Sequence, residues 1–248
     1  MIAHIALLAA LVVPHAPAPA PAVAVDGNLT LAALVSLADT HLDAVVDSVE
    51  TLAATPAAAS GNWNTIRPEL ANLSKRNLAG VYFYARANGT YWTVDKGLQK
   101  ATVSDRPYFA SAMRGTTVVG ALVSSRSTGK EVAVVAVPVR GADGTITGML
   151  GASIYLDAFS ARLAREIGLQ KGYIFFAMDR GGTIVLHADP TNIFLRPGTA
   201  SAEQAAIETR LLGPTDHPQT YVYRGVTRTM LLRDSPLTGW RFGFGIAH

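Results

Sequence analysis

Hydrophobic residues follow a helical period in the first part of this chain. Between residues 31 and 52, apolar side chains recur at i, i+3, i+4 and i+7, which predicts one long amphipathic helix. Asp39, Asp43 and Asp47 lie on its other face, and Pro56 ends the pattern. About 25 residues at 1.5 Å per residue give a helix roughly 38 Å long. We expect this helix to form a spine along the rest of the fold, with a dimer interface as the alternative.

From Val81 onward the pattern alternates with a period of two, which is typical of strands. The first set of strands is predicted at Val81–Arg86, Tyr91–Val94, Val118–Val123, Glu131–Arg140 and Thr145–Leu156, and the second set at 173–178, 183–187, 219–224, 226–233 and 240–247. The residues between the strands are rich in Gly, Asn and Asp, as turns require. The chain is therefore expected to form two sheets in succession.

Three shorter helices are predicted among these strands. The first starts at Ser104-Asp105-Arg106-Pro107, with Ser104 or Asp105 as its cap, and runs to about Gly115. A connecting helix is capped by Asp157 and stopped by Gly168, and a third lies near 202–212.

The two sets of strands resemble each other. Tyr82-Phe83-Tyr84-Ala85 passes through Asn88-Gly89-Thr90 into a second strand, and Ile174-Phe175-Phe176-Ala177 passes through Gly181-Gly182-Thr183 in the same way. Near the end of each half, Gly148–Ile154 likewise resembles Gly239–Ile246. Such a repeat indicates two small domains of one kind in tandem. Strands with a single helical insertion favour antiparallel α+β units over a parallel, doubly wound sheet.

Composition supports a folded chain with a core and excludes some partners. Of its 248 residues 49% are hydrophobic and only 16% are charged, which argues against disorder. The net charge of +3 is spread along the chain without a Lys/Arg cluster, so no nucleic-acid partner is expected. The chain has no cysteine, which excludes disulfides, thiolate metal sites and a lipoprotein anchor.

The N-terminus resembles an export signal. A short apolar run at Ile5–Val13 is followed by Pro14 and Ala-Pro repeats, and Ala22-Val23-Ala24 fits an A-x-A cleavage pattern. This run is too short to span a bilayer, and no later apolar run is expected to span one. Residues 1–24 contain no Lys or Arg, unlike an ordinary signal peptide, so a disordered Ala/Pro leader is the alternative. We expect a periplasmic or secreted protein.

Several motifs resemble the double Cache domain, a PAS-like extracytoplasmic sensor of bacterial and archaeal receptors. The most specific is Ser104-Asp105-Arg106-Pro107-Tyr108-Phe109, followed by Ser127-Thr128-Gly129-Lys130 and by Gly148–Leu156. In the second half, Gly182 to Pro190 resembles the family's His-x-Asp turn. The resemblance covers about residues 31–247. It implies an α+β fold with a long N-terminal helix and two tandem PAS-like antiparallel-sheet modules.

The resemblance also implies a division of the chain. Residues 1–24 would be a signal peptide, 25–60 the long helix, 61–156 a membrane-distal ligand-binding module, 157–170 a connecting helix and 171–248 a membrane-proximal module. The ligand pocket would lie in the first module, between the sheet and the Asp-Arg-Pro-Tyr-Phe segment.

Arg106 is the central candidate for ligand binding. A guanidinium matches a carboxylate, and the N–H groups of a helix start add positive potential. Tyr108 and Phe109 would provide a hydroxyl and an apolar wall. The alternative is an ion pair between Arg106 and a neighbour such as Asp105.

The amino-acid-binding branch of the family has a longer motif, which this chain matches only in part. By spacing from Arg106, its two tyrosines fall on Ala101 and Ser124, and its two ammonium-binding aspartates fall on Arg126 and Ser153. A cation facing Arg126 would be repelled. We therefore predict that free α-amino acids are not the ligand and that a small organic anion, such as a dicarboxylate, is. Arg126 could instead point into solvent.

Other aromatic and polar residues are weaker candidates. Tyr84, Trp92 and Tyr155 could line the pocket, although packing in the core is favoured for each, since alternate residues of a strand must face inward. His187 and Asp189 lack the further ligands that a metal site needs, which favours a turn with a hydrogen-bonded histidine. We expect neither a metal nor a cofactor.

The leading hypothesis is an exported small-molecule sensor for signal transduction or chemotaxis, which passes its ligand state to a membrane receptor or transducer. It would work alone or as the ectodomain of a longer receptor. The alternatives are a structural module that forms homodimers through its N-terminal helix, and an enzyme. Catalysis is not expected, because Gly151-Ala152-Ser153-Ile154-Tyr155 lacks the last glycine of a nucleophile elbow and no phosphate loop or carboxylate pair is present.

Overall fold

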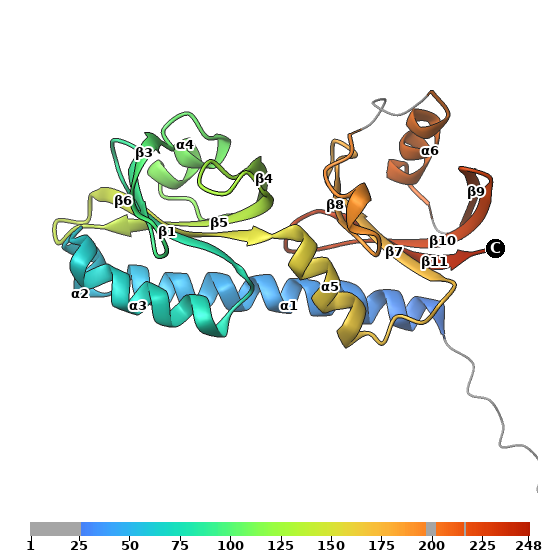
Figure 1. Ribbon diagram of the computed structural model, residues 1–248, viewed down its shortest axis with the longest axis horizontal. Coiled ribbons are helices and arrows are strands. Elements are labelled where there is room, and N and C mark those ends of the chain that lie inside the picture. The colour runs from blue at the N-terminus through green and yellow to red at the C-terminus, as the bar shows by residue number, and fades with distance from the viewer. Residues whose placement is uncertain (1–25, 197–201, 216) are drawn as a thin grey trace, which may run out of the picture.

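The computed structural model describes residues 26–196, 202–215 and 217–248. A long helix runs beneath two antiparallel sheets, and one short helix covers the opposite side of each sheet (Figure 1). The proposed signal peptide, residues 1–24, lies outside the described residues.

The long helix, α1, extends from Gly27 to Ala53 and packs against both sheets. Asp26 is its N-cap, and its carboxylate accepts hydrogen bonds from the backbone N–H groups of Asn28 at 2.9 Å and Leu29 at 3.2 Å. The helix therefore starts four residues before the expected Leu31, because the cap precedes the first buried apolar residue.

Helix α1 is also long and apolar enough, by length and composition, to cross a membrane. This corrects the expectation that no segment after the N-terminal run has that length. The same composition suits a helix in the centre of a fold, and here ten of its residues are buried beneath the sheets. Hydropathy alone does not separate these two roles.

Two helices follow that the sequence pattern did not predict. They are α2, Pro56–Ala59, and α3, Trp63–Arg76, which lies beside α1 and buries Ile66 and Leu70. Asn62 caps α3 by accepting a hydrogen bond from the N–H of Asn64.

The first sheet has six strands in the order β3-β2-β1-β6-β5-β4. These are β1 Gly80–Arg86, β2 Thr90–Thr93, β3 Gly97–Thr102, β4 Val118–Ser124, β5 Glu131–Arg140 and β6 Ile146–Tyr155. The edge strand β3 was not predicted. Helix α4, Pro107–Met113, covers the face opposite α1.

Two predicted helix caps are wrong. Arg106, and not Ser104 or Asp105, holds the N-cap position of α4, and its side chain makes no capping bond. The connecting helix α5, Leu156–Glu166, follows directly from β6, so Asp157 lies in its first turn and Tyr155 holds the cap position. Leu156, the first residue of α5, is fully buried directly after the last residue of β6. The helix therefore starts in the core, without a polar turn before it.

The second sheet has five strands in the order β8-β7-β11-β10-β9. These are β7 Tyr173–Met178, β8 Ile184–His187, β9 Gln219–Tyr223, β10 Val226–Asp234 and β11 Arg241–Ala247. A short 3-10 helix, η1 Pro190–Asn192, and helix α6, Ala202–Leu212, lie between β8 and β9. Without β3 the first sheet has the same topology, which confirms the predicted α+β fold of two sheet modules.

An identical close contact occurs in both modules. Phe83 on β1 pairs with Gly151 on β6, and Phe176 on β7 pairs with Gly243 on β11. A Cβ atom added to Gly151 or Gly243 would come within 2.5 Å or 2.4 Å of the facing phenyl ring. Glycine is thus required where this ring lies across the central strand.

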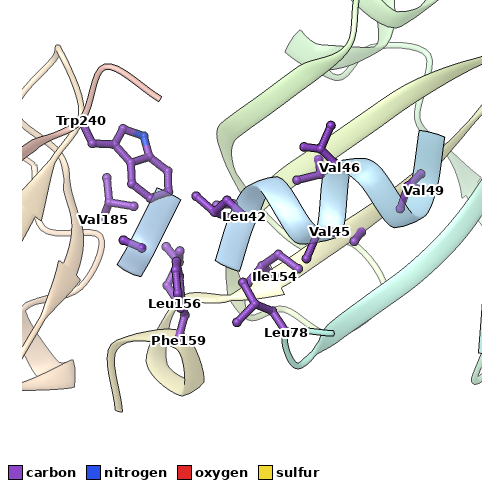
Figure 2. Packing of buried hydrophobic residues seen from close by; sticks show 14 of the residues in the cluster. Leu42, Val45, Val46, Val49, Leu78, Ile154, Leu156, Phe159, Val185 and Trp240 are labelled. Atoms are coloured by element: carbon purple, nitrogen blue, oxygen red, sulfur yellow. The ribbon is translucent and has the colours of Figure 1, made fainter. Parts of the chain in front are cut away.

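The two modules share one continuous core along α1. Figure 2 shows Leu42 and Val45 of α1 between Leu78 and Ile154 of the first module and Trp240 of the second. Trp240 is 3% exposed, and a Cβ added to Gly120 on β4 would come within 2.9 Å of its ring. Side chains of both modules therefore meet on the same helix.

Candidate functional site

The α4 segment is held to the sheet by Arg106. Its backbone is extended, as expected of a residue before proline, and its side chain is half-buried. The guanidinium Nη2 donates a hydrogen bond to the carbonyl oxygen of Ser124 at 2.8 Å. Arg106 therefore bridges the start of α4 and the end of β4, with part of its donor fork still available.

Arg126 pairs with Asp105 and does not point freely into solvent. Its Nη1 and Nη2 donate to the two carboxylate oxygens of Asp105 at 2.7 Å and 2.5 Å, and Nη1 also donates to the carbonyl of Thr102. This hydrogen bonding lowers the pKa of Asp105 and raises that of Arg126. Asp105 thus pairs with Arg126, and not with Arg106 as the alternative interpretation held.

A cavity of about 20 Å³ lies between α4 and the first sheet. Four of the predicted ligand-binding residues line it: Arg106, Tyr108, Arg126 and Ser153. Burial raises the pKa of Tyr108 to about 12, so its phenol stays protonated at neutral pH. The cavity therefore brings together two guanidinium groups and hydroxyl donors.

Phe109 and Ser124 lie beside this cavity without lining it. Phe109 is buried in the apolar cluster under α4. The Ser124 hydroxyl donates to the carboxylate of Glu131 at 3.0 Å, while its carbonyl holds Arg106. Their contribution to the site is to position α4 and Arg106.

Tyr84 and Trp92 lie on the other face of the sheet. Their rings stack at 6.0 Å between centroids, and Trp92 also stacks on Trp63 of α3 at 6.4 Å. Both belong to the core around α1. The structure thus does not bring them to the α4 cavity, since alternation along each strand directs them away from it. Tyr155 packs beside the cluster under α4, with the Lys130 ammonium 4.6 Å from its ring centroid.

The sequence pattern missed Tyr91, Thr93 and Ser125, which also line the cavity. Tyr91 and Thr93 flank Trp92 on β2. Because side chains alternate along a strand, they had to face away from Trp92, and this was the available signal.

The histidine turn of the second module agrees with its prediction. The backbone N–H of Asp189 donates to Nδ1 of His187 at 2.8 Å, and the N–H of His187 donates to the Ser160 hydroxyl. Burial, with the nearby charge of Arg228, lowers the pKa of His187 to about 4. The residues that the structure describes contain no group of three potential metal ligands.

Several solved structures share this fold. One is an extracellular ligand-binding receptor from Desulfohalobium retbaense, with a TM-score of 0.69 and 14% identity, covering 89% of this chain. This chain spans only 40% of that protein. No curated protein sequence matches this chain.

Two further structures are ligand-binding domains of chemoreceptors. One is from the amino acid chemoreceptor PctB of Pseudomonas aeruginosa in complex with L-Gln, with a TM-score of 0.68, 18% identity and 89% coverage of both chains. The other is from CtaA of Pseudomonas fluorescens in complex with L-isoleucine, with a TM-score of 0.65 and 16% identity, covering 89% of this chain and 88% of that one. The family model for the Cache domain matches residues 24–247. This chain therefore belongs to the Cache domain family of extracellular ligand-binding sensor domains, in its two-module form.

Proposed function

We propose that this chain is the sensing part of an extracytoplasmic signalling system, and that its first module binds a small organic anion. One observation carries the proposal. Arg106 and Arg126 reach the same cavity, and no acidic side chain among the described residues lines it. The apolar N-terminal segment supports export, and a membrane receptor or transducer would receive the signal.

The chemistry of the cavity suits a carboxylate. Each guanidinium presents a planar fork of N–H donors, which is complementary to the two oxygens of a carboxylate. Tyr108 and Ser153 add hydroxyl donors. These groups would hold a carboxylate at each end of a short molecule, so a dicarboxylate is the best first candidate.

A free α-amino acid would fit this cavity less well. The positions that match the ammonium-binding aspartates of the amino-acid-binding branch are Arg126 and Ser153, and both line the cavity. The carboxylate of Asp105 is close to Arg126, but both of its oxygens accept hydrogen bonds from that guanidinium. An ammonium group would therefore meet a positive charge where those relatives have a negative one.

Ligand entry requires the α4 segment to move outward. A volume of about 20 Å³ holds only one or two water molecules. The ligand would replace two contacts that now close the site, from Arg106 to the Ser124 carbonyl and from Arg126 to Asp105. Both are partly exposed hydrogen bonds that a carboxylate can exchange.

Calorimetric titration of the full chain tests this proposal. We expect succinate or another short dicarboxylate to bind, and alanine and glutamine to bind far more weakly. Arg106→Ala should weaken binding by roughly tenfold to a hundredfold, because a charge-assisted hydrogen bond contributes about 1.5–3 kcal/mol.

Arg114→Ala is the matched control. Arg114 is the C-cap of α4, at its other end, and its guanidinium donates a hydrogen bond to the Ser111 hydroxyl in that helix. It should leave affinity unchanged. Tight binding of neutral amino acids with none of any carboxylate would refute the proposal, as would equal affinities of the Arg106→Ala and Arg114→Ala proteins.

A further inference from the structure

A cavity in the second module is larger than the one under α4 in the first. It measures about 60 Å³, against about 20 Å³ under α4. It lies on the face of the second sheet opposite α1, beneath α6 and the segment after β8, at the position equivalent to the α4 cavity. Its apolar wall includes Phe176, Met178 and Ile207.

A partly buried arginine lines this cavity. Arg228 lies on β10 opposite Tyr221 of β9, and its guanidinium carbon is 4.8 Å from the ring centroid of Tyr223. Its Nε is buried and has no hydrogen-bond partner. Leaving a donor of a charged group unpaired in the interior is costly, so such an atom calls for an acceptor.

In the part of the chain that the structure describes, no group accepts a hydrogen bond from this Nε. Among the described residues, no acidic side chain lines the cavity. Asp189 does not line the cavity, and its Oδ1 accepts hydrogen bonds from the N–H and the hydroxyl of Thr191. Arg228 therefore has no carboxylate beside it among the described residues that line the cavity.

His187 adds a neutral donor to the same cavity. Its Nδ1 accepts the N–H of Asp189, so the neutral ring carries its proton on Nε2. Its low pKa, about 4, keeps the ring neutral in ordinary buffers. Histidine and Tyr221 thus line the cavity as hydrogen-bonding groups next to a single fixed positive charge.

We propose that this cavity is a second ligand site, which binds a short-chain aliphatic monocarboxylate. The carboxylate pairs with Arg228 and accepts from His187 or Tyr221, and the short alkyl tail lies against Phe176, Met178 and Ile207. The volume fits a molecule of about four to six heavy atoms, since one water needs about 10–15 Å³ of such space. The single arginine suits one carboxylate, whereas the cavity of the first module is lined by two arginines.

Titration of the full chain with propionate tests the second site. We expect binding with a Kd on the order of 1 mM or tighter, as for other small fragments. Arg228→Gln should weaken it by about tenfold or more, with the fold checked by circular dichroism. Arg224→Gln is the matched control, because Arg224 is exposed in the same β9–β10 hairpin and does not line the cavity.

Two further variants separate the sites and guard against misfolding. Ile207→Phe keeps Arg228 and fills the apolar end, so it should weaken butyrate more than acetate. Arg106→Ala should leave propionate binding intact, which distinguishes failure of this proposal from failure of the first-module site. If propionate does not bind, or binds equally well to the folded Arg228→Gln protein, water fills the cavity and the proposal is wrong.

Discussion

Three arginines show how local surroundings decide the use of one side chain. Arg126 has both oxygens of Asp105 as partners, Arg106 has a backbone carbonyl, and the Nε of Arg228 has none. The pairs of Arg106 and Arg126 are partly exposed and can exchange with a ligand at modest cost. The buried donor of Arg228 is more costly to leave unpaired, which is why it points to a second site.

His187 should make stability depend on pH. Its pKa is about 4 in the folded protein, against about 6.5 when unfolded, so its contribution is present above pH 6.5 and is lost as the pH falls toward 4. The loss amounts to roughly 3 kcal/mol, at 1.4 kcal/mol per pKa unit. His187→Asn keeps an acceptor for the Asp189 N–H but does not titrate.

Urea unfolding at pH 7.5, 5.5 and 4.5 measures this effect. The free energy of unfolding of the His187→Asn protein should fall less over this range than that of the unchanged protein. Parallel curves for the two proteins would show that another group controls the acid sensitivity.

The elements with a strong period were predicted well from sequence. Helix α1 and the strands around Phe83 and Phe176 are apolar on the buried side and have clear turns between them. Strand β3 was missed because it is an exposed edge strand, and Gln99 and Lys100 hide its alternation. Helix α3 was missed because Pro68 lies within it and resembles a helix breaker.

The cap of α1 makes a testable contribution to stability. Asp26→Ala removes the acceptor for the N–H groups of Asn28 and Leu29 and should cost about 1 kcal/mol. Thermal unfolding should then occur roughly 2–4 °C lower for a chain of this size. Asp26→Asn keeps the acceptor and should recover most of the loss. Equal melting temperatures for the Ala and Asn variants would exclude the cap as the cause.

At the scale of the whole molecule, the repeat was predicted from sequence, but the order of the strands in each sheet was not. Strand order depends on contacts between distant residues, such as Tyr82 on β1 with Ala152 on β6, which no local pattern records. Tyr84 and Trp92 pack in the core around α1, which was the interpretation favoured over a place in the pocket. The homodimer through α1 remains a prediction, and the exposed positions of that helix include the acidic Asp43 and Asp47.

Trp240 should couple the two modules. It is buried at the junction, against α1 and Gly120 of the first sheet (Figure 2). Trp240→Ala should cost about 3–5 kcal/mol and should separate one cooperative thermal transition into two, because the cavity loosens only the second module. Differential scanning calorimetry would resolve the transitions.

Trp63→Ala is the comparison for this variant. Trp63 stacks on Trp92 in the first module, away from the junction. Its loss should lower the melting temperature without splitting the transition. A single transition in the Trp240→Ala protein would show that α1 alone holds the modules together.

The course of α1 has a mechanical consequence. Its first turn lies near the C-terminal strand at one end of the molecule, and its last turns run beneath the module that carries α4 (Figure 1). A helix of 27 residues is about 40 Å long, so each degree of tilt about its middle, where Leu42 lies beside Trp240, displaces each end by about 0.35 Å. With Trp240 as the pivot, a tilt of a few degrees under the first sheet would therefore move the first turn of α1 relative to β11 by about 1 Å.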